Sequence, residues 1–184
     1  STLYNISGAI WLQGQLDIRL FEKSVNRIID RHEILRTSFP TEDGVPIQKI
    51  VSELILSIPI IDLSDLSEQK RQEEYIQLTT KEAQHPFNLE EGPLLRVLVI
   101  RMGEEDFVCV FSMHHIITDQ WSNDVFLREL AAFYSADLQE KTEILPKLPI
   151  QYVDYAHWQR TWLQEEEARR QLKYWQQKLK NTPP

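Results

Sequence analysis

The sequence is short of cysteine and glycine, and its basic residues are outnumbered by acidic ones. Cys109 is the only cysteine, so the chain has neither an internal disulfide nor a cysteine-rich zinc site. With 20 Lys and Arg against 28 Asp and Glu, the net charge of −8 argues against a nucleic-acid-binding face. No run reaches the ~20 apolar residues of a membrane span, and no signal-peptide pattern opens the chain. These absences predict a cytoplasmic protein with neither nucleic acid nor membrane as partner.

The five glycines are scattered. They form no P-loop and no dinucleotide fingerprint, and no serine nucleophile elbow is present. The 184 residues, 42% of them hydrophobic, suit one globular unit with a real core.

Apolar periodicity predicts interleaved strands and helices. A strand over Ile6–Leu12 leads into a helix capped by Asp17. Further extended runs and a polar helix follow, at Leu35–Phe39, Ile47–Val51, Leu54–Ile60 and Ser67–Ala83.

Two β-rich runs, Leu94–Arg101 and Asp106–His114, are joined by a short turn that predicts a hairpin. Phe107–Phe111 is apolar throughout, which is typical of a central strand buried on both faces. Helices are expected from about Ser122 to Ala136, then around Tyr152–Leu163, and finally around Leu172–Leu179. The fold class is therefore α/β (α+β), a two-layer sandwich of one mixed sheet with packed helices.

Two adjacent histidines, His114 and His115, leave the apolar strand, and Asp119 follows in the loop. Adjacent strand residues point to opposite faces, so one imidazole can face a cavity while the other is held inside. An imidazole that titrates near neutral pH can take a proton from an amine or hydroxyl attacking a carbonyl. From the residues alone, His115 is either catalytic or structural, and His114 is the more structural of the two. A metal site is disfavoured because the two side chains diverge. Arg36 is a natural partner for the Asp119 carboxylate.

Three segments resemble the motifs of nonribosomal peptide synthetase condensation domains. Arg31–Phe39 is similar to RHExLRTxF, and Met113–Ser122 is similar to MHHxxxDGWS. Tyr152–Trp158 is similar to YxDYAxW and follows in the same order.

The resemblance implies a chloramphenicol-acetyltransferase-like fold, of which residues 1–184 are the partial N-terminal lobe, with the second lobe absent from this chain. It implies peptide-bond formation between carrier-tethered thioesters, of the L-donor and L-acceptor type. No cofactor is bound directly, because substrates ride on 4′-phosphopantetheine arms. The implied partners are upstream and downstream peptidyl carrier domains, an adjacent adenylation domain and the missing lobe.

By the same resemblance, His115 is the catalytic histidine, and the site is shaped by His114, Asp119 and Arg36. Gln120, Trp121 and Ser122 tune the acceptor channel, and Gln120 replaces the motif glycine. Two alternatives stay open. One is a catalytically degenerate lobe that docks carriers or acts as a scaffold, and the other is an ester-forming or other acyltransferase of the same fold. The isolated 184-residue chain is expected to be inactive, because an interlobe site needs both walls.

Overall fold

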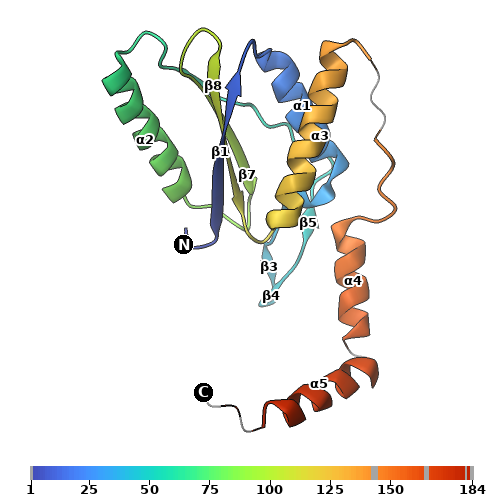
Figure 1. Ribbon diagram of the computed structural model, residues 1–184. Coiled ribbons are helices and arrows are strands. Elements are labelled where there is room, and N and C mark those ends of the chain that lie inside the picture. The colour runs from blue at the N-terminus through green and yellow to red at the C-terminus, as the bar shows by residue number, and fades with distance from the viewer. Residues whose placement is uncertain (1, 142–144, 164–165, 181, 183–184) are drawn as a thin grey trace. The chain divides into compact units, whose positions relative to one another are not determined.

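The computed structural model describes residues 2–141, 145–163, 166–180 and 182, which belong to two compact units, 1–146 and 147–184. The first unit is built on a mixed sheet with the strand order β1-β8-β7-β6 (Figure 1). β8 pairs antiparallel with β1 and with β7, whereas β6 runs parallel to β7. The strand bounds are β1 Asn5–Gln13, β6 Ile60–Asp62, β7 Leu95–Arg101 and β8 Asp106–His114. The mixed sheet and the β7–β8 hairpin are confirmed.

Helices cover both faces of this sheet. Helices α1 (Ile18–Arg31) and α3 (Gln120–Leu138) share a core with one face, and α2 (Glu68–Gln84) packs on the opposite face (Figure 1). The α/β class with packed helices is confirmed, and α2 adds a third layer to the two that were expected.

The central strand β8 divides its side chains between these two layers. Cys109, Phe111 and Met113 belong to the core under α1 and α3, whereas Val108 and Val110 belong to the core under α2. Every β8 residue except Asp106 is buried, as expected of a central strand. Burial raises the pKa of the Cys109 thiol to about 12, so this cysteine is an inert core residue.

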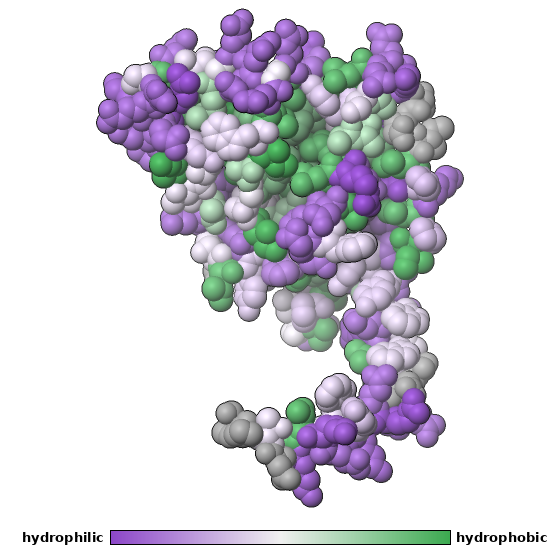
Figure 2. Space-filling view, viewed as in Figure 1, coloured by the Kyte–Doolittle hydropathy of each residue, from purple (hydrophilic) through white to green (hydrophobic). Residues whose placement is uncertain are grey.

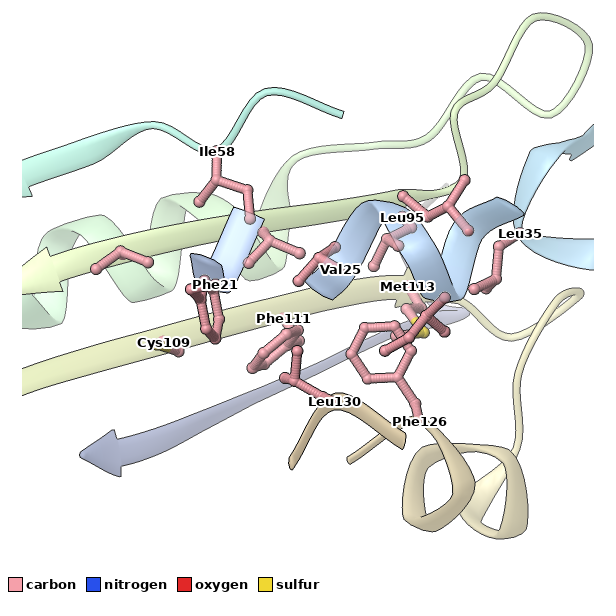
Figure 3. Packing of buried hydrophobic residues seen from close by; sticks show 14 of the residues in the cluster. Phe21, Val25, Leu35, Ile58, Leu95, Cys109, Phe111, Met113, Phe126 and Leu130 are labelled. Carbon is pink, nitrogen blue, oxygen red and sulfur yellow. The ribbon is translucent and has the colours of Figure 1, made fainter. Parts of the chain in front are cut away.

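Helix α1 forms as its sequence predicts. The Asp17 carboxylate caps it by accepting hydrogen bonds from the backbone N–H groups of Arg19 and Leu20. The apolar stripe faces the sheet: Phe21 approaches Phe111, and Val25 lies over the strands (Figure 3). On α3, Phe126 packs edge-on against the same Phe111 ring, so this core holds both helices to the sheet.

The segment between α1 and α2 departs from the predicted strands. Glu33–Arg36 is a 3₁₀ turn, η1, and only the next residues pair as β2 (Thr37–Ser38) with β5 (Lys49–Ile50). Of the predicted strand Leu54–Ile60, only Ile60 belongs to a strand. A small hairpin forms from β3 (Thr41–Glu42) and β4 (Val45–Pro46).

The second unit contains α4 (Tyr152–Trp162) and α5 (Glu166–Lys178). Gln151 and Asp154 form a capping box at the start of α4. The rings of Tyr152, Tyr155 and Trp158 follow one another along α4, with centroids 6.0 and 5.7 Å apart. Within the described parts of the chain, no helix is long and apolar enough to cross a membrane.

Candidate active site

The candidate site lies where the buried strand β8 ends and helix α3 begins. His114 is the last residue of β8 and Gln120 is the first of α3, so residues 115–119 form a tight connection between them. The connection is anchored by the buried residue Ile117, whose N–H donates to the His114 carbonyl at 3.0 Å. A functional group in this turn is therefore held by a rigid strand on one side and a helix on the other.

His115 is exposed and is held by hydrogen bonds at two of its atoms. Its backbone N–H donates to the Tyr4 carbonyl at 2.8 Å. Its ring Nδ1 lies 2.7 Å from the carbonyl oxygen of Thr118. Because a carbonyl oxygen only accepts, Nδ1 carries the hydrogen, and the neutral ring then has its lone pair on Nε2. This tautomer presents an acceptor nitrogen on an oriented, accessible ring, which is what a general base requires.

His114 occupies the opposite environment. It is buried, and its Nδ1 accepts a hydrogen bond from the Ile116 N–H at 3.1 Å. The rings of Tyr4 and Phe87 lie 6.1 and 6.3 Å away. Burial, and then the neighbouring His115, lower the pKa of His114, so its imidazole is neutral near pH 7. The hydrogen bond from Ile116 ties this imidazole to the backbone of the turn.

Asp119 caps helix α3. One of its oxygens accepts from the Ser122 N–H at 2.8 Å and from the Ser122 hydroxyl at 2.6 Å. These hydrogen bonds lower the pKa of Asp119, and His115 adds to the effect. The carboxylate is thus ionised at neutral pH and sits at the positive end of the helix.

The expected pairing of Arg36 with Asp119 is wrong. Arg36 ends the 3₁₀ turn, where its guanidinium contacts the Glu33 carboxylate at 3.4 Å, one turn back, and donates to the Val51 carbonyl. The turn gives Arg36 partners close by in the chain, while Asp119 is already satisfied by Ser122. Arg36 therefore ties the 3₁₀ turn to the segment after β5 and forms no hydrogen bond or ion pair with Asp119.

Gln120, Trp121 and Ser122 form the first turn of α3. The Gln120 side-chain amide donates to the Asp124 carboxylate at 3.3 Å, one turn further on. Trp121 is 78% exposed, so it does not contribute to the core. Successive residues of this turn point to different sides of the helix, which places them over two separate hollows.

Two hollows flank the start of α3, and the sequence did not predict them. The α1–α3 pocket, about 220 Å³, is mainly apolar; its lining includes His32, Leu35, Ile117, Thr118, Trp121, Ser122 and Val125. The β1–α3 groove, about 340 Å³, has a polar wall on α3; its lining includes Ile6, Gly8, Ile10, Gln120, Asn123, Asp124 and Leu127.

Glu129 is a further residue that the sequence reasoning missed. It is 7% exposed on the apolar side of α3, where its two oxygens contact Arg31 Nε at 3.2 Å and His32 Nε2 at 2.7 Å. A glutamate within the stripe formed by Phe126 and Leu130 was the available signal, since a buried carboxylate needs a partner. Its ion pair with Arg31 and its hydrogen bond with His32 fasten α3 to the end of α1.

No group of three or more potential metal ligands occurs among the described residues. The groups of the site that can take part in chemistry are therefore the His115 imidazole and the Asp119 carboxylate that caps α3. The two hollows beside them are the places where a substrate can bind.

Comparison with known proteins identifies the class to which this fold and turn belong. The condensation-domain family model matches residues 1–184, and the chain belongs to that family. Linear gramicidin synthase subunits C and B of Brevibacillus parabrevis are 46% and 45% identical to it over 184 residues, all of this chain. The chain spans only 2% and 4% of those two proteins.

Solved structures agree with the fold. The SgcC5 protein of Streptomyces globisporus matches with a TM-score of 0.82 and 28% identity, over 96% of this chain and 40% of that one. The starter condensation domain of rhizomide synthetase matches with a TM-score of 0.90, over 100% of this chain and 44% of that one. At 21% identity, the second match shows the fold alone. The resemblance to condensation domains and the fold it implied are confirmed.

Proposed function

We propose that this chain is the N-terminal lobe of a condensation domain, and that His115 acts in forming a peptide bond between two carrier-tethered substrates. The observation that carries the proposal is the orientation of His115. Its Nδ1–H is engaged by the Thr118 carbonyl, which leaves Nε2 free on an exposed ring. The family membership and the synthase relatives support the choice of reaction.

In the proposed reaction, the amine of an acceptor aminoacyl group attacks the carbonyl carbon of a donor thioester. The C–N bond forms and the C–S bond breaks, so the products are an amide and a free thiol. His115 Nε2 receives the proton lost by the attacking nitrogen and returns it to the departing thiolate sulfur. Asp119 keeps its negative charge throughout, and that charge favours the imidazolium that forms for a moment on His115.

The other site residues have supporting roles in this proposal. His114 fixes the end of β8, Asp119 starts α3, and Arg36 shapes the site indirectly through the segment after β5. Gln120, Trp121 and Ser122 line the acceptor channel, a role consistent with their places over the two hollows.

The substrates are proposed to ride on 4′-phosphopantetheine arms of upstream and downstream carrier domains, with an adenylation domain adjacent, in the cytoplasm. The L-donor, L-acceptor type is part of the proposal and rests on the sequence motifs. A second lobe completes the site. Two walls are needed to exclude water and to align two thioesters, so the 184-residue chain alone is expected to be inactive.

One observation favours a second candidate, a degenerate lobe that binds carriers without catalysis. Gln120 stands where the family motif has glycine, and its side chain extends along α3 to Asp124. A long side chain at that place obstructs a channel if nothing compensates for its volume.

The test uses a whole condensation domain that contains this chain, supplied with aminoacyl-loaded donor and acceptor carriers. Dipeptidyl-carrier formation is followed by intact-protein mass spectrometry for the native protein, His115→Ala and Gln120→Gly. Dipeptide from the native domain, with a loss of about 10²-fold or more in His115→Ala, supports the proposal. Dipeptide from Gln120→Gly alone supports the degenerate lobe instead.

A further inference from the structure

The β1–α3 groove lies on the same side of the sheet as the catalytic turn. Ile6 pairs with Met113, two residues before His115, and both belong to the face covered by α1 and α3. The Tyr4 carbonyl, just before β1, accepts the His115 N–H. Figure 2 shows apolar atoms recessed between β1 and α3, with polar atoms beside them. A molecule lying in this groove therefore has one end near His115.

Gly8 forms the floor of the groove, and the fold does not require a glycine there. It is not among the glycines with a positive φ. A Cβ built on it meets no atom within 4 Å. Glycine within a strand lowers stability relative to alanine. Gly8 thus weakens the strand without relieving any steric crowding. The effect that remains is the space left in the floor of the groove, between Ile6 and Ile10, where a side chain would otherwise lie.

The wall opposite Gly8 carries a single charge. Of the described residues that line the groove, Asp124 is the one that is ionisable, and none of the described lysines and arginines forms an ion pair with it. Gln120 donates its amide hydrogen to Asp124, so the Gln120 carbonyl oxygen remains an acceptor beside the carboxylate. Two adjacent acceptors, one of them anionic, suit a group that is cationic and rich in hydrogen-bond donors, such as a protonated amine.

We propose that the β1–α3 groove binds the amine-bearing acceptor aminoacyl group, with Gly8 providing the space and the Gln120–Asp124 pair contacting the amine. This inference rests on the proposed amide-forming function and specifies its acceptor side. Gly8 and Gln120 are then complementary: the glycine on the strand makes room for the longer residue on the helix. The amine binds at the carboxylate as an ammonium ion and releases one proton to solvent water, which leaves a neutral nucleophile. The second proton, lost by the nitrogen as the amide forms, goes to His115 Nε2 as in the proposed reaction.

The experiment uses the whole condensation domain with Gly8→Val, and Gln13→Val as the matched control. Gln13 is an exposed residue of the same strand that does not line the groove. Because valine favours strands and a Cβ at this position meets no atom within 4 Å, Gly8→Val should fold at least as stably as the native domain. KM for the acceptor should rise about tenfold, as overfilling a fitted space does, while KM for the donor stays unchanged. A rise in the donor KM instead, or no change in either, overturns the proposal.

A binding measurement separates this inference from the proposed function. The probe is an unreactive aminoacyl-pantetheine amide, titrated by calorimetry into the native domain, Gly8→Val and Asp124→Asn. Both variants should bind it at least about threefold more weakly, and acetylation of its amine should remove the effect of Asp124→Asn. If the native domain makes no dipeptide yet shows this pattern, the groove assignment stands and the proposed function fails. Equal binding of the probe by all three proteins overturns the groove assignment.

Discussion

Removing the Glu129 carboxylate should destabilise the whole domain more than an ordinary surface substitution does. Glu129, Arg31 and His32 have side chains that are 9%, 17% and 21% exposed, so the ion pair with Arg31 and the hydrogen bond with His32 are mostly buried. Breaking a fully buried pair costs about 3–5 kcal/mol, whereas exposed pairs contribute below about 1 kcal/mol. With the partners partly hydrated, we expect Glu129→Ala to lower the free energy of unfolding by about 2–3 kcal/mol.

Urea unfolding followed by tryptophan fluorescence measures this loss. Glu74→Ala is the matched control, because Glu74 is an exposed glutamate in helix α2, and it should change stability by less than about 0.5 kcal/mol. Turnover in Glu129→Ala should fall less than in His115→Ala, since Glu129 only fastens the helix that follows the turn. If Glu129→Ala is as mild as the control, the anchoring role assigned to the carboxylate is refuted.

Four further outcomes are expected. Asp119→Ala should cost about 1 kcal/mol through loss of the α3 cap, measured by urea unfolding, and Asp119→Asn should cost less. The pKa of His114 is lowered in the folded protein, so the unfolded chain gains this proton first as the pH falls. The stability that this group contributes is complete above the ordinary histidine pKa of 6.5 and is lost below it. Denaturation series from about pH 7.5 to 5 should show this slope, reduced in His114→Gln. Ile29→Ala, at a fully buried site, should cost about 3 kcal/mol in the same unfolding assay. Trp121→Ala should leave the thermal midpoint within about 2 °C, because that ring is outside the core.

The elements that were predictable from the sequence are those whose pattern is fixed by local geometry. Helix α1 has an apolar stripe at helical spacing and a capping Asp17, and it forms as expected. The apolar run of β8 predicted a central strand, and the sheet places β8 between β1 and β7. In both cases the signal lies within a few residues of the element that it predicts.

The segment Leu54–Ile60 shows why alternation is not sufficient to predict a strand. Its apolar residues do alternate, with Ile58 buried and Leu56 packed against the same core. Its backbone, however, bonds to side chains of α1: the Leu56 N–H donates to Asn26, and the Ile58 N–H donates to Glu22. The sequence pattern reports which side chains face the core, but it does not reveal whether a neighbouring strand or a helix supplies the hydrogen bonds.

The candidate site was predictable only in part, for a related reason. The turn carrying His115 and Asp119 is contiguous, so its motif identifies it. The roles given to Gly8, Asp124 and Glu129 depend on residues of other elements, most of them more than 90 positions away in the chain. Gly8, for example, pairs with Phe111, and Glu129 contacts Arg31. The Arg36–Asp119 pairing failed in the same way, because chemical complementarity does not establish proximity.

The spacing between His115 and Asp119 has a physical reason that links the two residues. The intervening residues Ile116–Thr118 turn the chain back, so that the Thr118 carbonyl meets the His115 ring and the very next residue caps α3. One turn therefore performs two tasks, fixing the imidazole tautomer and starting the helix. The period of two along β8 also sets the direction of His114, the last residue of the strand. Cys109, Phe111 and Met113 belong to the core under α1 and α3, whereas Val108 and Val110 belong to the core under α2. Alternation along the strand therefore directs His114 to the α2 side, and His115 lies in the turn that follows.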